Sequence, residues 1–140
     1  MQVLALDIGE KRIGIASGNT ESRIAMPLRV LPAADVCGNA RPWRDILADY
    51  EPELLVVGCP TSLSGEQGRQ AERVRGVAEK IAAAAALPLE YVDDRLSSAE
   101  AKRILREQGL SERDMRGRVD MVAASVFLQT WLDKTTKEES

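Results

Sequence analysis

Residues 3–16 constrain the fold of this chain more than any other segment. Four apolar residues at positions 3–6 lead to a carboxylate at Asp7, Gly9 allows a turn, and a second apolar run follows at positions 13–16. This pattern predicts two adjacent strands joined by a tight bend, with Asp7 at the end of the first. A buried carboxylate there is costly unless a cation accompanies it, and Lys11, Arg12 or a metal ion can serve. The alternative is an ordinary turn aspartate.

The length and composition limit the classes of protein to consider. With 140 residues, we expect a single domain at positions 1–133, followed by a charged tail at positions 134–140. The formal net charge of −3 argues against a protein that coats nucleic acid through bulk electrostatics, although local basic patches remain compatible with it. No apolar stretch reaches the length of a membrane span, so we expect a soluble cytoplasmic protein without a membrane partner.

The chain contains no histidine, which excludes histidine bases and histidine metal ligands. Its two cysteines, Cys37 and Cys59, lack the paired spacing of zinc sites. Cys59 lies within an apolar run and is interpreted as a small buried hydrophobic residue.

The remaining pattern predicts an α/β fold. A third strand is expected at positions 24–31, where Pro27 indicates an edge strand or a bulge, followed by a loop at positions 32–39. Positions 53–59 contain an apolar run without alternation, which is typical of a strand buried on both faces. The other expected elements are a strand at 89–92 and helices at 41–49, 67–86, 97–108 and 117–133, with Ser97 or Ser98 as a cap. This order predicts three layers, with a mixed sheet covered by helices on both faces.

Acidic residues occur at comparable places in several of these elements. Asp7 ends the first strand, Asp93 and Asp94 end the last, and Asp120 interrupts the final helix near its start. Because ligand sites of α/β proteins usually lie at the carboxyl ends of parallel strands, these acids are expected to meet at one sheet edge. Clustered carboxylates repel one another unless a cation is present, and a hard ion such as Mg²⁺ fits them best. The alternatives are a helix cap for Asp120 and a turn residue for Asp93.

Four motifs in this order resemble those of the YqgF family, whose members are described as pre-16S rRNA nucleases and Holliday junction resolvase-like proteins. The motifs are residues 4–14, residues 57–60 with Gly65, residues 93–101, and Val119-Asp120 with Ala123-Ala124. The resemblance covers nearly the whole chain. It implies a ribonuclease H-like fold with a mixed five-stranded sheet, and a metal-dependent phosphodiesterase acting on pre-16S rRNA in ribosome biogenesis or on Holliday junctions.

The resemblance also implies the site residues. Asp7, Asp94 and Asp120 match the catalytic and metal-binding acids, with Mg²⁺ as the expected ion and Mn²⁺ as an alternative. The chain departs from the family at Asp94, where glutamate is usual, and Mg²⁺ is sensitive to such a change in length. Asp93 is interpreted as a structural residue or as a support for the ligands, because neighbouring strand residues point to opposite faces.

Several cations and hydroxyls are candidate contacts for nucleic acid. Lys11 and Arg12 follow Asp7 directly, and the loop hydroxyls of Thr61 and Ser62 precede a helix N-terminus, which favours anions. Arg95 is expected to brace the acids or contact phosphate, with an ion pair to Asp93 as the equal alternative. Arg116 and Arg118 form a basic flank before Asp120. The expected partner is pre-16S rRNA or branched DNA, bound by a monomer or a homodimer.

Two other functions share features of this sequence. The first is a nucleic-acid or ribosome-assembly binding module whose metal site is impaired by Asp94. The second is a Mg²⁺-nucleotide-binding protein related to actin-like ATPases and sugar kinases, which also place Asp-x-Gly after a first strand. We expect the second alternative to fail because a chain of this length holds only one such domain.

Overall fold

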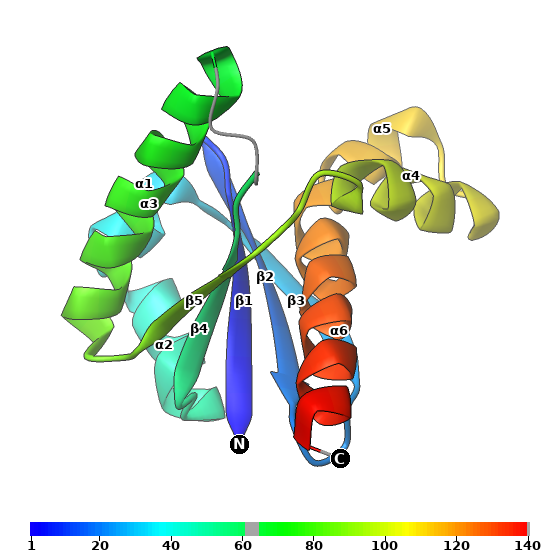
Figure 1. Ribbon diagram of the computed structural model, residues 1–140. Coiled ribbons are helices and arrows are strands. Elements are labelled where there is room, and N and C mark those ends of the chain that lie inside the picture. Colours follow the sequence, from blue (N-terminus) through cyan, green and yellow to red (C-terminus); the bar gives the residue numbers. More distant parts are fainter. Residues whose placement is uncertain (61–64, 140) are drawn as a thin grey trace.

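Five strands form one mixed sheet in the order β3-β2-β1-β4-β5 (Figure 1). The structure, a computed structural model, describes residues 1–60 and 65–139, and the side chains of these residues except 66, 67 and 136–139. The strands are β1 (Gln2–Ile8), β2 (Arg12–Asn19), β3 (Ala25–Pro32), β4 (Leu54–Gly58) and β5 (Leu89–Val92). Strands β1, β4 and β5 are parallel, whereas β2 is antiparallel to both of its neighbours. The predicted mixed five-stranded sheet is therefore confirmed.

Helices cover both faces of this sheet. One face is covered by α1 (Ala33–Cys37), α2 (Arg41–Tyr50) and α3 (Gly65–Ala85). The other face is covered by α6 (Val119–Glu139). Helices α4 (Ser97–Glu107) and α5 (Glu112–Arg116) pack against the first turns of α6. Helix α6 runs against the direction of β1, so its N-terminal end lies at the edge where β1, β4 and β5 end (Figure 1). The three-layer arrangement agrees with the prediction.

Strand β1 separates two hydrophobic cores, because its side chains alternate between the two faces. Leu4, Leu6 and Ile8 belong to the core beneath α1, α2 and α3. Val3 and Ala5 belong to the core beneath α6. The same alternation places Asp7 on the α6 face, at the end of a row that is otherwise apolar.

Pro27 lies in an edge strand and beside a bulge, and both interpretations are confirmed. Strand β3 pairs only with β2, at the margin of the sheet. Its register shifts between Ile15, which pairs with Arg29, and Ala16, which pairs with Pro27. Proline lacks a backbone N–H, so in a central strand it would remove a ladder hydrogen bond. An edge strand beside a bulge does not require that hydrogen bond.

The structure corrects three expectations about the helices. Residues 32–39 contain the short helix α1 rather than only a loop, and α5 was not predicted, because five residues are too few to display a helical period. Helix α4 has Leu96 at its N-cap position and no side-chain cap, so the predicted serine cap is wrong. Helix α6 continues to Glu139 instead of ending at Asp133, since neither glycine nor proline interrupts it.

Both cysteines are free, and Cys59 is buried as expected. Every helix in the described part of the chain is too short or too polar to serve as a membrane span.

Candidate active site

Asp7 lies at the carboxyl end of β1, where the row of buried side chains beneath α6 reaches the sheet edge. Burial raises the pKa of the Asp7 carboxyl from 3.8 to about 7, and the negative charges of Asp120 and Asp94 contribute to this rise. Two of the acids predicted from the sequence, Asp120 and Asp94, are therefore close enough to repel the third, Asp7. Burial combined with like charge is typical of a functional carboxylate rather than of a turn residue.

Gly14 explains how Asp120 reaches this position. Gly14 lies opposite Asp7 in the β1–β2 ladder. A Cβ atom at Gly14 would lie 2.1 Å from the carbonyl carbon of Asp120 and 2.5 Å from the backbone N of Met121. Real Cβ contacts are never this short, so only glycine allows the backbone of α6 to rest directly on the sheet. This contact places the first turn of α6, and Asp120 with it, beside Asp7.

Gly58 has the corresponding role on the other side of β1. It ends β4 and follows Val57, which pairs with Leu6 of β1. A Cβ atom at Gly58 would lie 2.8 Å from the Cβ atom of Asp94 and 2.6 Å from the Phe127 ring. Asp94 therefore lies over the end of β4 on the α6 face. Burial raises the pKa of the Asp94 carboxyl, Asp93 raises it further, and a hydrogen bond from the backbone of Asp94 itself partly offsets the rise.

The two neighbouring aspartates have different environments. Asp93 accepts from Arg95, whose Nε lies 2.9 Å from Oδ2 of Asp93 and whose backbone N–H lies 3.0 Å from Oδ1. Arg95 thus forms the ion pair that was the alternative to a phosphate contact. Asp94 instead lies close enough to Asp7 for its negative charge to raise the pKa of the Asp7 carboxyl.

Asp120 forms an ion pair with Arg12, in which Nε of Arg12 lies 3.3 Å from Oδ2 of Asp120. Within the described residues, no group of three or more acidic or cysteine side chains is gathered closely enough to form a ready-made metal cluster. The chemistry of the donors nevertheless fits a hard divalent cation, because three carboxylates on three separate elements provide only oxygen ligands. Burial raises the pKa of the Asp7 carboxyl and the charges of Asp120 and Asp94 raise it further, and a bound cation would correct this charge imbalance.

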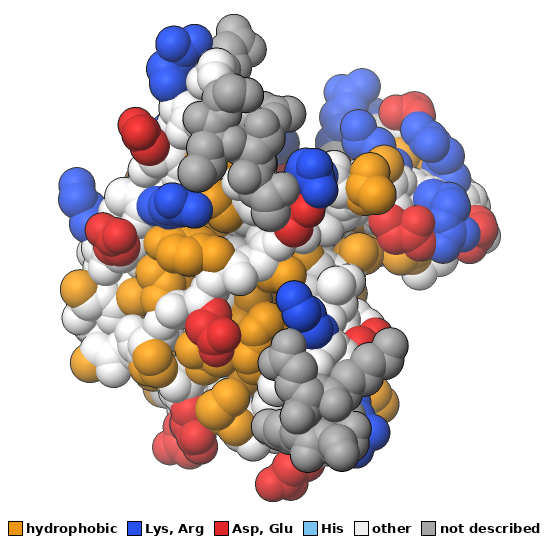
Figure 2. Space-filling model, in the orientation of Figure 1, with side chains coloured by type: hydrophobic (Ala, Val, Ile, Leu, Met, Phe, Trp, Pro, Cys, Tyr) orange, Lys and Arg blue, Asp and Glu red, His pale blue; other side chains and the backbone are white. Residues whose placement is uncertain are grey.

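The predicted nucleic-acid contacts lie around this edge. Lys11, Arg116 and Arg118 are exposed, and the two arginines directly precede the first turn of α6. Figure 2 shows Lys and Arg side chains on the lobe formed by α4 and α5 and on the N-terminal half of α3. Thr61 and Ser62 lie outside the described residues.

One known protein family matches nearly the whole chain. The sequence model of the RuvX family, described as Holliday junction resolvase, matches residues 1–134. The chain belongs to the RuvX family. RuvX and YqgF are two names of one family, so this finding confirms the resemblance inferred from the four motifs. The motifs lie in β1 and the following turn, at the end of β4, after β5 and at the start of α6.

Individual members of the RuvX family resemble the chain over nearly its full length. A protein of Anaeromyxobacter sp. (strain Fw109-5), named "Putative pre-16S rRNA nuclease", is 42% identical over 133 residues, which span 95% of this chain and 97% of that protein. A protein of Thermosynechococcus vestitus with the same name is 39% identical over 133 residues, spanning 95% of this chain and 88% of that protein.

Solved structures with the same fold include two resolvases. Thermus thermophilus RuvC in complex with a Holliday junction substrate superposes with a TM-score of 0.56 at 16% identity, covering 97% of this chain and 96% of that chain. The fowlpox virus Holliday junction resolvase gives a TM-score of 0.54 at 12% identity, covering 96% and 99%. At these identities the likeness shows the fold, and it confirms the ribonuclease H-like architecture.

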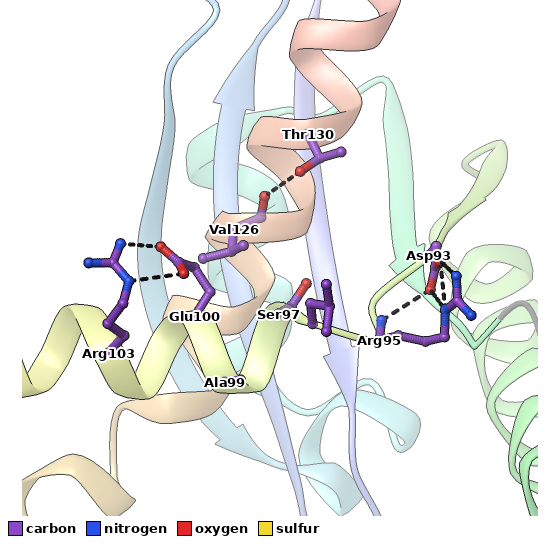
Figure 3. Close-up of a pocket in the computed structure, with 9 residues that line it drawn as sticks. Asp93, Arg95, Ser97, Ala99, Glu100, Arg103, Val126 and Thr130 are labelled. Carbon is purple, nitrogen blue, oxygen red and sulfur yellow. Dashed lines mark hydrogen bonds and ion pairs between the residues drawn. The ribbon is translucent and has the colours of Figure 1, made fainter.

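A groove of about 900 Å³ lies beside the acids, between α4 and α6 (Figure 3). Its floor includes Val126 and Thr130, and its charged groups pair with one another, Arg95 with Asp93 and Arg103 with Glu100. Asp7, Asp94 and Asp120 do not line it. The groove is therefore lined largely by the motif at residues 93–101, and it lies beside the three acids without including them.

Sequence reasoning did not recognise what Gly58 contributes. In the sequence Gly58 is one residue of a motif, and the structure shows that it makes room for Asp94. The available signal was a glycine at the end of an otherwise fully apolar strand, which often marks the close approach of another group.

Proposed function

We propose that this protein is a metal-dependent nuclease that hydrolyses phosphodiester bonds, with Asp7, Asp94 and Asp120 as its catalytic and metal-binding residues. The observation that carries this proposal is the pair of glycines flanking Asp7, since Gly14 and Gly58 admit Asp120 and Asp94 to the same sheet edge. A fold needs no such arrangement for its stability, because it gathers repelling charges. Membership of the RuvX family supports the same function.

Mg²⁺ is the proposed cofactor, with Mn²⁺ as an alternative. Bound by the three aspartates, such an ion supplies an activated water molecule and neutralises the charge that develops on the phosphate. The residues of the chain hold the ligands in place: β1 fixes Asp7, and the contact between α6 and Gly14 fixes Asp120. Arg95 holds Asp93, so Asp93 supports the turn that carries Asp94.

We propose pre-16S rRNA as the first candidate substrate, because relatives spanning nearly the whole chain carry that name. Holliday junctions are the second candidate, favoured by the description of the RuvX family. Lys11, Arg12, Arg116 and Arg118 are the proposed contacts to the phosphate backbone, which give affinity without reading sequence. The nuclease would comprise residues 1–133 as one domain and act in the cytoplasm as a monomer or homodimer.

The decisive experiment compares cleavage of labelled precursor 16S rRNA and of a four-way DNA junction under identical conditions. Each substrate is incubated with the wild-type protein and Mg²⁺, with the protein in EDTA, and with the Asp7→Asn variant. Cleavage of one substrate that depends on both Mg²⁺ and Asp7 is the expected result, and it identifies the substrate class. Binding of both substrates without cleavage of either contradicts the proposal and favours the binding module.

Asp94 gives a second test against that binding module. If the natural site is active, the Asp94→Glu variant is expected to cleave at a rate within about tenfold of the wild type, because one methylene changes the ligand's reach but not its chemistry. Initial rates under saturating Mg²⁺ measure this. A gain of more than about 100-fold on restoring the family's usual glutamate would instead show that the site is impaired by Asp94.

A further inference from the structure

Arg12 links the turn after Asp7 to the N-terminal end of α6. It is the first residue of β2, and its carbonyl accepts from the Gly9 N–H at 2.9 Å, which fixes the backbone from which its side chain extends. Its Nε lies 3.3 Å from Oδ2 of Asp120, 108 positions away in the sequence. The Arg12 side chain is 58% exposed and that of Asp120 is 31% exposed. The pair therefore lies at the mouth of the acidic edge, within reach of solvent and ligands.

Of the three acids, Asp120 is the one that this ion pair involves. Among the described residues, the Arg12–Asp120 pair is the only salt bridge formed by Asp7, Asp94 or Asp120. One of the three proposed metal ligands therefore has a cation as its neighbour, while the other two, which are half-buried, have no salt-bridge partner among the described residues. A guanidinium that donates to Asp120 occupies an oxygen that an ion would need, and it repels the ion as well.

We propose that Arg12 competes with the divalent cation for Asp120, and that binding of the cation releases the Arg12 guanidinium to contact a phosphate of the nucleic acid. This inference rests on the proposed function, because it concerns the same three acids. Exposed ion pairs are weak, so the exchange of partners costs only about two- to fivefold in metal affinity.

The exchange couples two binding events. In the metal-free protein Arg12 is committed to Asp120, whereas in the metal-loaded protein it is available to a phosphate oxygen. The cation and the nucleic acid then each strengthen the binding of the other, since such coupling is reciprocal. Arg12 is thus a positioning residue with two alternative partners, which explains why a residue expected to contact phosphate is found on a metal ligand.

The first test is a calorimetric titration of Mn²⁺ into the metal-free protein, without nucleic acid. The Arg12→Ala variant is expected to bind Mn²⁺ about two- to fivefold more tightly than the wild type. Arg41→Ala is the matched control, because Arg41 also pairs with an aspartate, Asp45, at 3.9 Å, but on α2. Lys11→Ala removes an equal charge next to Arg12. Unchanged or weaker Mn²⁺ binding by Arg12→Ala, or an equal gain in Lys11→Ala, overturns the proposal.

The second test measures the release of Arg12 through the binding of a fluorescent RNA hairpin, followed by anisotropy in Ca²⁺ or in EDTA. In EDTA, the wild type and Arg12→Ala are expected to bind equally. In Ca²⁺, the wild type is expected to bind more tightly by about threefold, the effect of one phosphate contact. A loss of affinity in Arg12→Ala that is the same with and without the ion overturns the proposal.

These outcomes can be separated from a failure of the proposed function. If no variant binds Mn²⁺, both the metal-dependent nuclease and this inference are wrong. If Mn²⁺ binds the wild type and Arg12→Ala equally, the competition at Asp120 is wrong while the nuclease proposal stands.

Discussion

Replacing Asp7 with asparagine is expected to abolish cleavage and, at the same time, to stabilise the metal-free protein. The substitution removes a proposed carboxylate ligand of the metal. Loss of a group that merely supports a ligand typically lowers metal affinity or activity by about 10- to 100-fold, so we expect the cleavage rate to fall by at least about 100-fold. It also removes a charge that is buried and repelled by Asp94 and Asp120. A site that binds metal at the expense of stability predicts opposite effects on the two quantities.

The stabilisation is expected to depend on pH. The pKa of Asp7 is raised from 3.8 to about 7, so the folded protein holds this proton more tightly than the unfolded chain does. The contribution of Asp7 to stability is therefore fully present below pH 4 and is lost as the pH rises towards 7. At 1.36 kcal/mol per pH unit, the loss is about 4 kcal/mol at most. The asparagine side chain of the Asp7→Asn variant does not titrate in this range, so the variant does not lose stability in this way as the pH rises.

Thermal unfolding in EDTA at pH 5 and pH 8 measures this effect. We expect Asp7→Asn to raise Tm by roughly 5 °C at pH 8 and by much less at pH 5. Asp45→Asn, which changes an exposed aspartate on α2, is the control and is expected to show no such difference. A Tm of Asp7→Asn below that of the wild type at pH 8 would mean that Asp7 is a structural aspartate, satisfied by the fold.

The position of Asp7 could be predicted because it depends only on local information. Its apolar neighbours define the strand, and strand alternation together with Gly9 defines where the strand ends. The choice of Asp94 over Asp93 as the metal ligand stays a prediction; the structure places Asp94 over the end of β4 and Asp93 on Arg95, a pairing that the sequence could not decide. The pairing of Arg95 with Asp93 depends on how the chain turns after β5, and two adjacent acids offer the same partner.

The short helices and the placement of Asp120 could not be predicted from local information of this kind. Helix α5 becomes identifiable through Ser111, whose side chain accepts from the backbone N–H of Asp114 at 3.2 Å, and through Met115, which packs into the small core between α4 and α6. The placement of Asp120 depends on how α6 lies on the sheet. That arrangement is set by a stripe of small residues on β2, Gly14, Ala16 and Gly18, which a linear pattern describes only as a strand with weak propensity.

Gly14 therefore leads to the second prediction with a large effect. The Gly14→Ala variant places a methyl group 2.1 Å from the backbone of Asp120, where no flexible side chain can move away. Either α6 lifts from the sheet or the β1–β2 hairpin bends, and we expect the free energy of unfolding in urea to fall by about 3 kcal/mol. Displacing α6 also carries Asp120 away from Asp7, so we expect Mn²⁺ affinity to fall by roughly tenfold or more.

Gly76→Ala provides the matched control, because Gly76 lies within α3 and a Cβ atom there would meet nothing within 4 Å. Alanine is the better helix former, so this variant is expected to be more stable than the wild type by about 0.5–1 kcal/mol, with unchanged Mn²⁺ affinity. The same added methyl group thus has opposite effects at the two sites. If Gly14→Ala were as stable as Gly76→Ala and bound Mn²⁺ normally, α6 could not rest on β2 at Gly14. The approach of Asp120 to Asp7, on which the proposed active site depends, would then be wrong.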